Sequence, residues 1–283
     1  MRFLTYLNPH SAEAEPGPGV LVGDDQVGDL RALGFVSLTS VIQGGTAALA
    51  RISGAHLALT PLAEVKLLAP IPRPNKLICV GLNYRDHAAE TGAVIPEVPT
   101  IFNKFPTCVI GPGAPIVLPK VSNSPDYEAE FAFVIGKGGR HIAEADWRDH
   151  VFGYTIVNDV SARDYQRATT QWLMGKTFDT FGPMGPWIVS QEEISDPHNL
   201  SVRMVINGET LQNGNTRELI FNIPKLIAFL SSVFTLEPGD VVSTGTPSGV
   251  GAARKPPRWL LPGDDVAVQI QGIGELRNPV VAE

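Results

Sequence analysis

The sequence predicts a β-rich α+β fold in two parts, a small N-terminal domain over residues 1–69 and a larger domain over residues 70–283. Many short β-favouring segments outnumber the few helical ones, which argues against a doubly wound sheet. The boundary is placed at Pro70-Ile71-Pro72-Arg73-Pro74. Each proline fixes φ and removes an N–H donor, so this segment is a stiff linker.

The N-terminal part is expected to form a small, separate unit. Residues 3–7 and 19–22 are predicted strands of a hairpin, with Pro16-Gly17-Pro18-Gly19 as the loop between them. Residues 41–52 are compatible with one short helix. No residue in this part points to chemistry.

The larger domain shows short apolar segments separated by turn residues. Its predicted strands are residues 76–81, 100–104, 116–118, 126–135, 151–159, 186–189, 201–206, 209–212, 240–244, 266–270 and 274–277. Its predicted helices are residues 82–90, 144–150, 162–173 and 223–234. The last is the clearest, because Pro224 lies in its first turn and apolar residues recur at helical spacing.

The composition is that of a soluble globular protein, with 43% hydrophobic and 18% charged residues. A net charge of −7 argues against non-specific binding to nucleic acid or to an anionic membrane. No apolar run is long enough to span a bilayer. Cys79 and Cys108 lie in apolar segments, which predicts two core thiols rather than a disulfide or a metal pair. These features favour a cytoplasmic protein.

Two carboxylates share one face of a predicted strand. Glu128 and Glu130 are two residues apart, and side chains at that spacing point the same way. Either they form a solvent-exposed polar face, or a divalent cation offsets their repulsion, and oxygen ligands suit Mg²⁺, Mn²⁺ or Ca²⁺. Asp159 ends a buried strand, where it could cap the next helix or supply a third ligand.

Two other signals concern proton transfer and anion binding. His87 and Glu90 share a helical face, either as an exposed pair or as an acid–base dyad. Lys176 lies among apolar residues, so its ammonium reaches water or serves an anionic site. Gly175-Lys176-Thr177 is not a phosphate loop, because Thr170 stands where that motif requires glycine. Lys104 is a further polar candidate for substrate binding.

Five ordered motifs resemble those of the fumarylacetoacetate hydrolase family over about residues 70–280. They are Gly81-Leu82-Asn83-Tyr84 leading to His87 and Glu90, Glu128-x-Glu130, Asn158-Asp159 with Ala162-Arg163-Asp164, Gly175-Lys176-Thr177-Phe178-Asp179, and Thr244-Gly245-Thr246-Pro247-Ser248-Gly249-Val250-Gly251. The resemblance is specific for the family and much less so for the substrate.

The resemblance implies a mixed β-sandwich roll with a small N-terminal domain, in a homodimer. It implies Mg²⁺ or Mn²⁺ held by Glu128, Glu130 and Asp159, and a general-base dyad of His87 and Glu90. It also implies that Lys176 contacts the enolate oxygen, and that Thr246, Arg163 and Gln166 are polar substrate contacts.

The implied activity is metal-dependent hydrolysis of a carbon–carbon bond in a 2,4-diketo acid, either an acylpyruvate or a diketo sugar acid. The dyad would activate water, and the metal and Lys176 would stabilise the enolate that leaves. Oxaloacetate decarboxylation, isomerisation of hydroxymuconate-type diacids and a ureidoglycolate lyase reaction remain alternatives. A metal-stabilised binding protein is the non-enzyme alternative.

Overall fold

The computed structural model describes residues 1–8 and 15–283. Its strands are β1 (Arg2–Leu7), β2 (Gly17–Val22), β3 (Gln26–Asp29), β4 (Leu59–Pro61), β5 (Lys66–Leu68), β6 (Leu77–Gly81), β7 (Thr100–Lys104), β8 (Val109–Ile110), β9 (Ile116–Leu118), β10 (Pro125–Asp126), β11 (Ala129–Ile135), β12 (Val151–Asn158), β13 (Ser161–Ala162), β14 (Gly182–Ser190), β15 (Ser201–Ile206), β16 (Glu209–Asn215), β17 (Val241–Ser243), β18 (Asp265–Ile270) and β19 (Gly274–Ala282). Its α-helices are α1 (Leu38–Gln43), α2 (Gly45–Ser53), α3 (Arg85–Thr91), α4 (Trp147–His150), α5 (Arg163–Arg167), α6 (Leu173–Lys176) and α7 (Ile223–Val233).

Two sheets dominate the fold. The larger follows the order β4-β3-β2-β1-β14-β12-β11-β17-β6-β7, and the smaller follows β16-β15-β18-β19-β9. Most pairs are antiparallel, whereas β17 and β6 are parallel, so the large sheet is mixed. Side chains of both sheets, such as Phe131, Phe133, Met204 and Val268, share one buried cluster. The predicted β-rich α+β sandwich roll is therefore confirmed.

The central strand β11 carries the site, and its burial explains its sequence. Every residue from Ala129 to Ile135 is buried, because β12 and β17 flank the strand and the small sheet covers one of its faces. A strand covered in this way is apolar on both faces, so the buried Glu130 is out of place unless it has partners.

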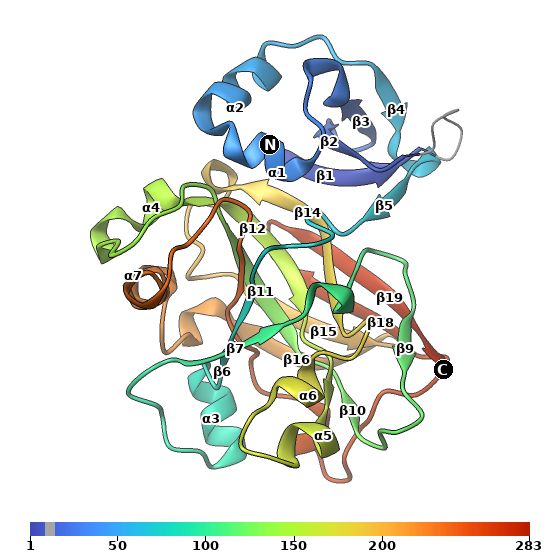
Figure 1. The fold of residues 1–283 in the computed structure, drawn as a ribbon. Helices are drawn as coiled ribbons and strands as arrows, with labels where there is room; N and C mark the ends of the chain where they lie inside the picture. The colour runs from blue at the N-terminus through green and yellow to red at the C-terminus, as the bar shows by residue number, and fades with distance from the viewer. Residues whose placement is uncertain (9–14) are drawn as a thin grey trace.

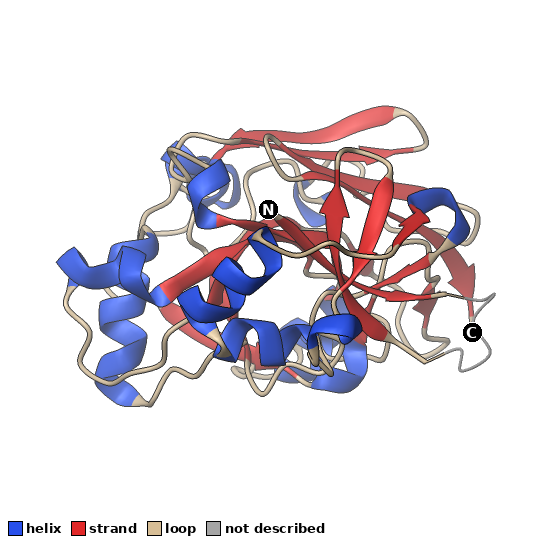
Figure 2. Ribbon diagram, turned by 90° about the horizontal axis from the view of Figure 1, so that it is seen from above, coloured by secondary structure: helices blue, strands red, loops and turns tan. Residues whose placement is uncertain are grey.

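The N-terminal part continues the large sheet across residue 70. Strand β1 pairs with β14 of the larger part as well as with β2. In Figure 1 this part lies at one end of the molecule, while α3, α5 and α6 lie at the other. Figure 2 shows most helices gathered on one side of the strands. The first 69 residues thus share a sheet with the rest of the chain, although they were expected to stand apart.

Three predicted boundaries were wrong for local reasons. The expected loop Pro16–Gly19 lies largely within β2. Pairing with β3 begins only at Gly19, so β3 requires no N–H donor from Pro18. The helix expected over residues 41–52 is two helices, since Gly45 has a φ of +53°. The helix expected over residues 162–173 is interrupted between α5 and α6.

Other expectations were met. Helix α7 begins after Asn222, whose side chain accepts a hydrogen bond from the backbone N–H of Lys225, and Pro224 lies in its first turn. Cys79 and Cys108 are buried and unpaired. Within residues 1–8 and 15–283, no helix has the length and apolarity needed to cross a membrane.

Candidate active site

Three buried carboxylates converge at the ends of β11 and β12. Glu130 is in β11, Glu128 immediately precedes that strand, and Asp159 immediately follows β12. The backbone N–H of Asp159 donates to the Glu128 carbonyl oxygen over 3.0 Å, which fixes the two side by side. One oxygen from each of the three carboxylates lies within 4.8 Å of the others. Asp159 does not cap the following helix, because α5 begins only at Arg163.

Three basic side chains surround this acidic cluster. Lys176 Nζ lies 2.6 Å from Glu128 and 2.7 Å from Asp159. Lys104 Nζ lies 2.6 Å from the other oxygen of Asp159, and Arg163 Nη2 lies 2.7 Å from Glu128. Glu128 and Asp159 are therefore each paired with two cations, as buried charges require.

Glu130 is the carboxylate without such a partner. Ser243 Oγ and the backbone N–H of Gly245 both donate to its Oε2, at 2.6 and 3.0 Å. Burial, together with the negative charges of Asp159 and Glu128, raises the pKa of Glu130 well above its usual value. Burial also opposes ionisation of Glu128, but Lys176 and Arg163 outweigh it and lower its pKa to about 2.

This imbalance fits a bound divalent cation. The carboxylates supply oxygen ligands at a site where one of them, Glu130, has no cation to offset its charge on ionisation, which is the setting in which Mg²⁺ or Mn²⁺ binds. Glu130 Oε1 has no hydrogen bond to the described residues, so it is available as a ligand. The predicted ligand set is therefore assembled in one place.

The predicted dyad lies on α3. His87 Nδ1 is 3.0 Å from Glu90 Oε2, and the backbone N–H of Gly249 donates to Glu90 Oε1 over 2.8 Å. The loop after β17 thus fixes the carboxylate that orients the histidine. A carboxylate beside Nδ1 favours a proton on that nitrogen, which leaves Nε2 as the base. His87 lines the cavity and Glu90 lies behind it.

One cavity of about 340 Å³ joins these groups. The predicted site residues that line it are His87, Glu128, Glu130, Asp159, Arg163, Gln166, Lys176 and Thr246. Lys104 does not line it. Its buried ammonium holds Asp159 and the carbonyl oxygen of Val160 from outside the cavity, so the structure places it as a support for a carboxylate rather than as a substrate contact.

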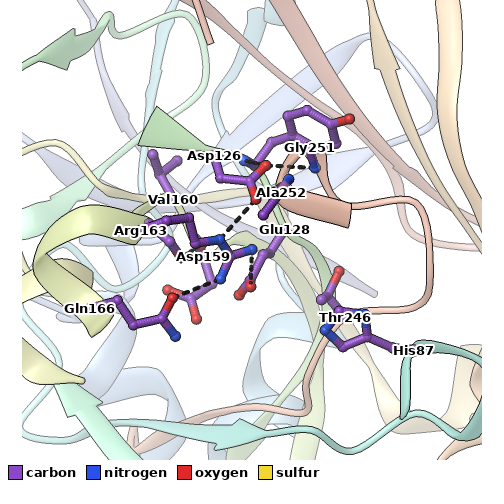
Figure 3. Close-up of polar contacts among 12 residues, drawn as sticks. His87, Asp126, Glu128, Asp159, Val160, Arg163, Gln166, Thr246, Gly251 and Ala252 are labelled. Atoms are coloured by element: carbon purple, nitrogen blue, oxygen red, sulfur yellow. Dashed lines mark hydrogen bonds and ion pairs between the residues drawn. The ribbon is translucent and has the colours of Figure 1, made fainter. Parts of the chain in front are cut away.

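Several residues that build the site were not predicted from the sequence. Gln212 donates to Thr246 Oγ1 and accepts from the backbone N–H of Ala129, and Asn83 donates to the carbonyl oxygen of Thr244. Arg167 is exposed on α5 and also lines the cavity. Asp126 binds Arg163, as Figure 3 shows. Its signal was available, because it precedes Glu128 at the same two-residue spacing.

Comparison with known proteins identifies the family. The family model described as fumarylacetoacetate (FAA) hydrolase C-terminal matches residues 76–281. The chain belongs to the fumarylacetoacetate hydrolase family. The match covers the predicted site residues and begins just after the proline linker.

Relatives in this family are enzymes with related but different reactions. The mitochondrial oxaloacetate tautomerase Fahd2a of Rattus norvegicus is 44% identical over 288 residues, which span 99% of this chain and 92% of that one. A 5-carboxymethyl-2-hydroxymuconate delta-isomerase from Mycobacterium smegmatis has a TM-score of 0.81 and 38% identity, covering 100% of this chain and 99% of that one. A maleylpyruvate hydrolase from Sphingobium sp. SYK-6, solved with manganese (II) and pyruvate, has a TM-score of 0.81 and 33% identity at the same coverage. Family membership makes this chain an enzyme of keto-acid metabolism.

Proposed function

We propose that this enzyme interconverts the keto and enol forms of a small dicarboxylic 2-keto acid, with oxaloacetate as the substrate. The observation that carries the proposal is that His87, which Glu90 orients, and the Lys176 ammonium line the same cavity. A base and a fixed cation are the two groups that enolisation needs. The oxaloacetate tautomerase relative, which aligns over nearly the whole chain, supports the choice of substrate.

The side chains account for both proton transfers. In the keto-to-enol direction, His87 Nε2 takes a proton from C3 and the electron pair moves to the C2 oxygen. Lys176 stabilises the negative charge on that oxygen. His87 then gives up the proton it took, and the oxygen receives it, so the base is regenerated and the product is an isomer of the substrate. Burial opposes the charge on Lys176, but Asp159 and Glu128 raise its pKa, so it remains an ammonium. A divalent cation held by Glu128, Glu130 and Asp159, which is Mg²⁺ or Mn²⁺, would polarise the keto oxygen as a Lewis acid.

A second carboxylate on the substrate requires a second cationic contact. Arg163 and Gln166 line the inner cavity near Glu128, where they can bind the carboxylate next to the keto group. Arg167 lines the same cavity and forms no ion pair with any residue the structure describes. We assign the distal carboxylate to Arg167, which makes the preferred substrate a dianion.

The test compares a dianionic with a monoanionic substrate. The loss of enol absorbance is followed for oxaloacetate with Mg²⁺ or Mn²⁺ and after EDTA, and release of pyruvate from acetylpyruvate is followed in parallel. Arg167→Gln should raise KM for oxaloacetate about 10-fold or more and change that for acetylpyruvate little. Arg203→Gln is the control, because Arg203 is exposed, lies outside the cavity and forms no ion pair within residues 1–8 and 15–283. Wild-type protein that leaves the rate of enol loss unchanged would refute the tautomerase proposal.

Hydrolysis of a 2,4-diketo acid is the second candidate. The maleylpyruvate hydrolase neighbour and the orientation of His87 by Glu90 support it, because the same base can activate water for attack at C4. Acetylpyruvate cleavage faster than oxaloacetate tautomerisation would favour this reaction. Release of pyruvate from oxaloacetate would instead reveal decarboxylation.

Assembly and location are also proposed rather than observed. We propose a homodimer, because β7 and β4 are open edges of a large sheet, and such edges are commonly covered in stable proteins. The two buried thiols favour the cytoplasm, whereas the rat relative is named as mitochondrial. Cell fractionation decides between these compartments.

A further inference from the structure

We propose that Asp126 is a positioning residue for the reaction, acting through Arg163. Asp126 does not line the cavity, so it has no contact with substrate. Its carboxylate instead ties the arginine that lines the cavity to the loop that follows β17. The inference rests on the proposed function, since it assigns Arg163 to the substrate carboxylate.

The Asp126 carboxylate is saturated with donors. Arg163 Nε donates to its Oδ2 over 2.8 Å, and the backbone N–H groups of Gly251 and Ala252 donate to Oδ1 and Oδ2 over 2.7 and 3.0 Å. The backbone N–H of Tyr127 adds a contact of 2.9 Å to Oδ1. A fully buried carboxylate with this many donors holds its partners in fixed positions, because removing any partner leaves buried charge uncompensated.

Asp126 fixes the orientation of the whole guanidinium group. Arg163 Nη1 donates to Gln166 Oε1 over 2.9 Å, and Nη2 lies 2.7 Å from Glu128 Oε1 (Figure 3). Nη2 itself is buried, and its contact with Glu128 is an ion pair without hydrogen-bond geometry. Anchoring Nε in a planar group sets the direction of both other nitrogens. Asp126 therefore sets how the guanidinium group lies against Glu128 and Gln166, which both line the cavity.

The loop reaches Asp126 only because residue 251 is glycine. A Cβ at Gly251 would lie 2.5 Å from Asp126 Oδ1 and 2.0 Å from the carbonyl oxygen of Arg258. The same loop carries Thr246 and holds Glu90 through the N–H of Gly249. Asp126 thus connects Arg163 to the segment that supports the dyad. Gly251→Ala therefore disturbs this connection while keeping an aspartate at position 126.

The test uses Asp126→Asn, Arg163→Lys and the double variant in Mn²⁺-loaded protein. Mn²⁺ affinity and the affinity for oxalate, a metal-chelating dianion, are measured by calorimetry, alongside kcat and KM for oxaloacetate. Asp264→Asn is the matched control. Asp264 is also buried, accepts from Arg258 Nη2 and the backbone N–H of Leu261 over 2.8 Å each, and lies outside the cavity.

Asp126→Asn is expected to weaken oxalate binding and kcat/KM by roughly 10–100-fold, the loss typical of groups that orient a metal-site residue. The change should fall on KM more than on kcat, because His87 and Lys176 remain in place. The double variant should be no worse than the worse single variant, because both act through one guanidinium. Asp264→Asn should lower the melting temperature and leave oxalate binding unchanged.

Additive losses in the double variant, or wild-type oxalate binding by Asp126→Asn, would overturn the proposal. If Asp126→Asn does not fold, the oxalate affinity of Gly251→Ala is compared with that of wild type. Wild-type oxalate binding by Gly251→Ala would equally contradict the role proposed for Asp126. Failure of the proposed function gives a different pattern. In that case wild-type protein binds Mn²⁺ and oxalate but does not turn over oxaloacetate, and the oxalate comparison still decides the role of Asp126.

Discussion

Replacing Glu130 with glutamine should stabilise the metal-free protein and abolish most of its stabilisation by metal. Glu130 is 2% exposed and has no ion pair with any residue that the structure describes, and its pKa is raised from its ordinary value of 4.5 by burial and by Asp159 and Glu128. Each pH unit over which the folded protein holds this proton above the ordinary pKa costs about 1.4 kcal/mol of stability. Glutamine removes that cost and can still accept the hydrogen bonds from Ser243 and Gly245.

The sign of the pH dependence follows from the raised pKa. A carboxyl whose pKa is higher in the folded state adds stability below its unfolded pKa, and this stability is lost as the pH rises through the folded-state pKa. In EDTA, Glu130→Gln should therefore match wild type near pH 4.5 and exceed it increasingly toward pH 7. For a chain of this size, 1 kcal/mol corresponds to about 2–4 °C in melting temperature.

Mn²⁺ should reverse the order of the two proteins. Metal at 100 times its dissociation constant adds about 2.7 kcal/mol to wild type, and less to a variant that lacks one ligand. Asp159→Asn is the contrasting variant. It breaks contacts with Lys104 and Lys176, and should cost about 3–5 kcal/mol without metal. Scanning calorimetry in EDTA and in Mn²⁺ measures all of these changes, and a lower melting temperature for Glu130→Gln in EDTA would refute the reasoning.

Three other predictions concern the dyad, the lysine and the assembly. His87→Ala should lower kcat by roughly 10²–10⁴-fold, the usual loss for a general base, while Mn²⁺ affinity measured by calorimetry stays at the wild-type value. Loss of the metal would make His87 a ligand instead. Lys176→Met should depress tautomerisation and hydrolysis alike in the paired assays, because both place negative charge on the same oxygen; a loss confined to one substrate would contradict this. Sedimentation at micromolar concentration should show a dimer, and a monomer alone would end that proposal.

Much of the site could be predicted from the sequence because strand geometry is local. The two-residue spacing put Glu128 and Glu130 on one face, and the three-residue spacing joined His87 to Glu90. Sequence spacing alone does not place Asp159 in the site, since only the pairing of β11 with β12 brings it beside Glu128. Lys104 could not be placed in this way, because its position behind Asp159 depends on the packing of β7 near the site.

In the fold, too, elements with a local sequence pattern were predicted, whereas pairing between residues far apart in the sequence was not. Strand β11 and helix α7 carry strong local patterns and were found. The N-terminal part was expected to stand apart because the proline linker is visible in the sequence. The pairing of Phe3 with Ile188 joins segments too far apart for any local pattern to reveal. Asp126 could have been predicted, because it precedes Glu128 at the same two-residue spacing that relates Glu128 to Glu130.

Pairing between β1 and β14 also bears on how the chain folds as it is made. Strands β1, β2 and β3 can form a hairpin unit early, but the partner that joins β1 to the main sheet is synthesised near residue 188. Strand β6 likewise waits for β17, and β9 waits for β19. Such non-local pairing slows folding and leaves strand edges exposed while synthesis continues. A ribosome-bound chain that stops before β14 should therefore depend on chaperones.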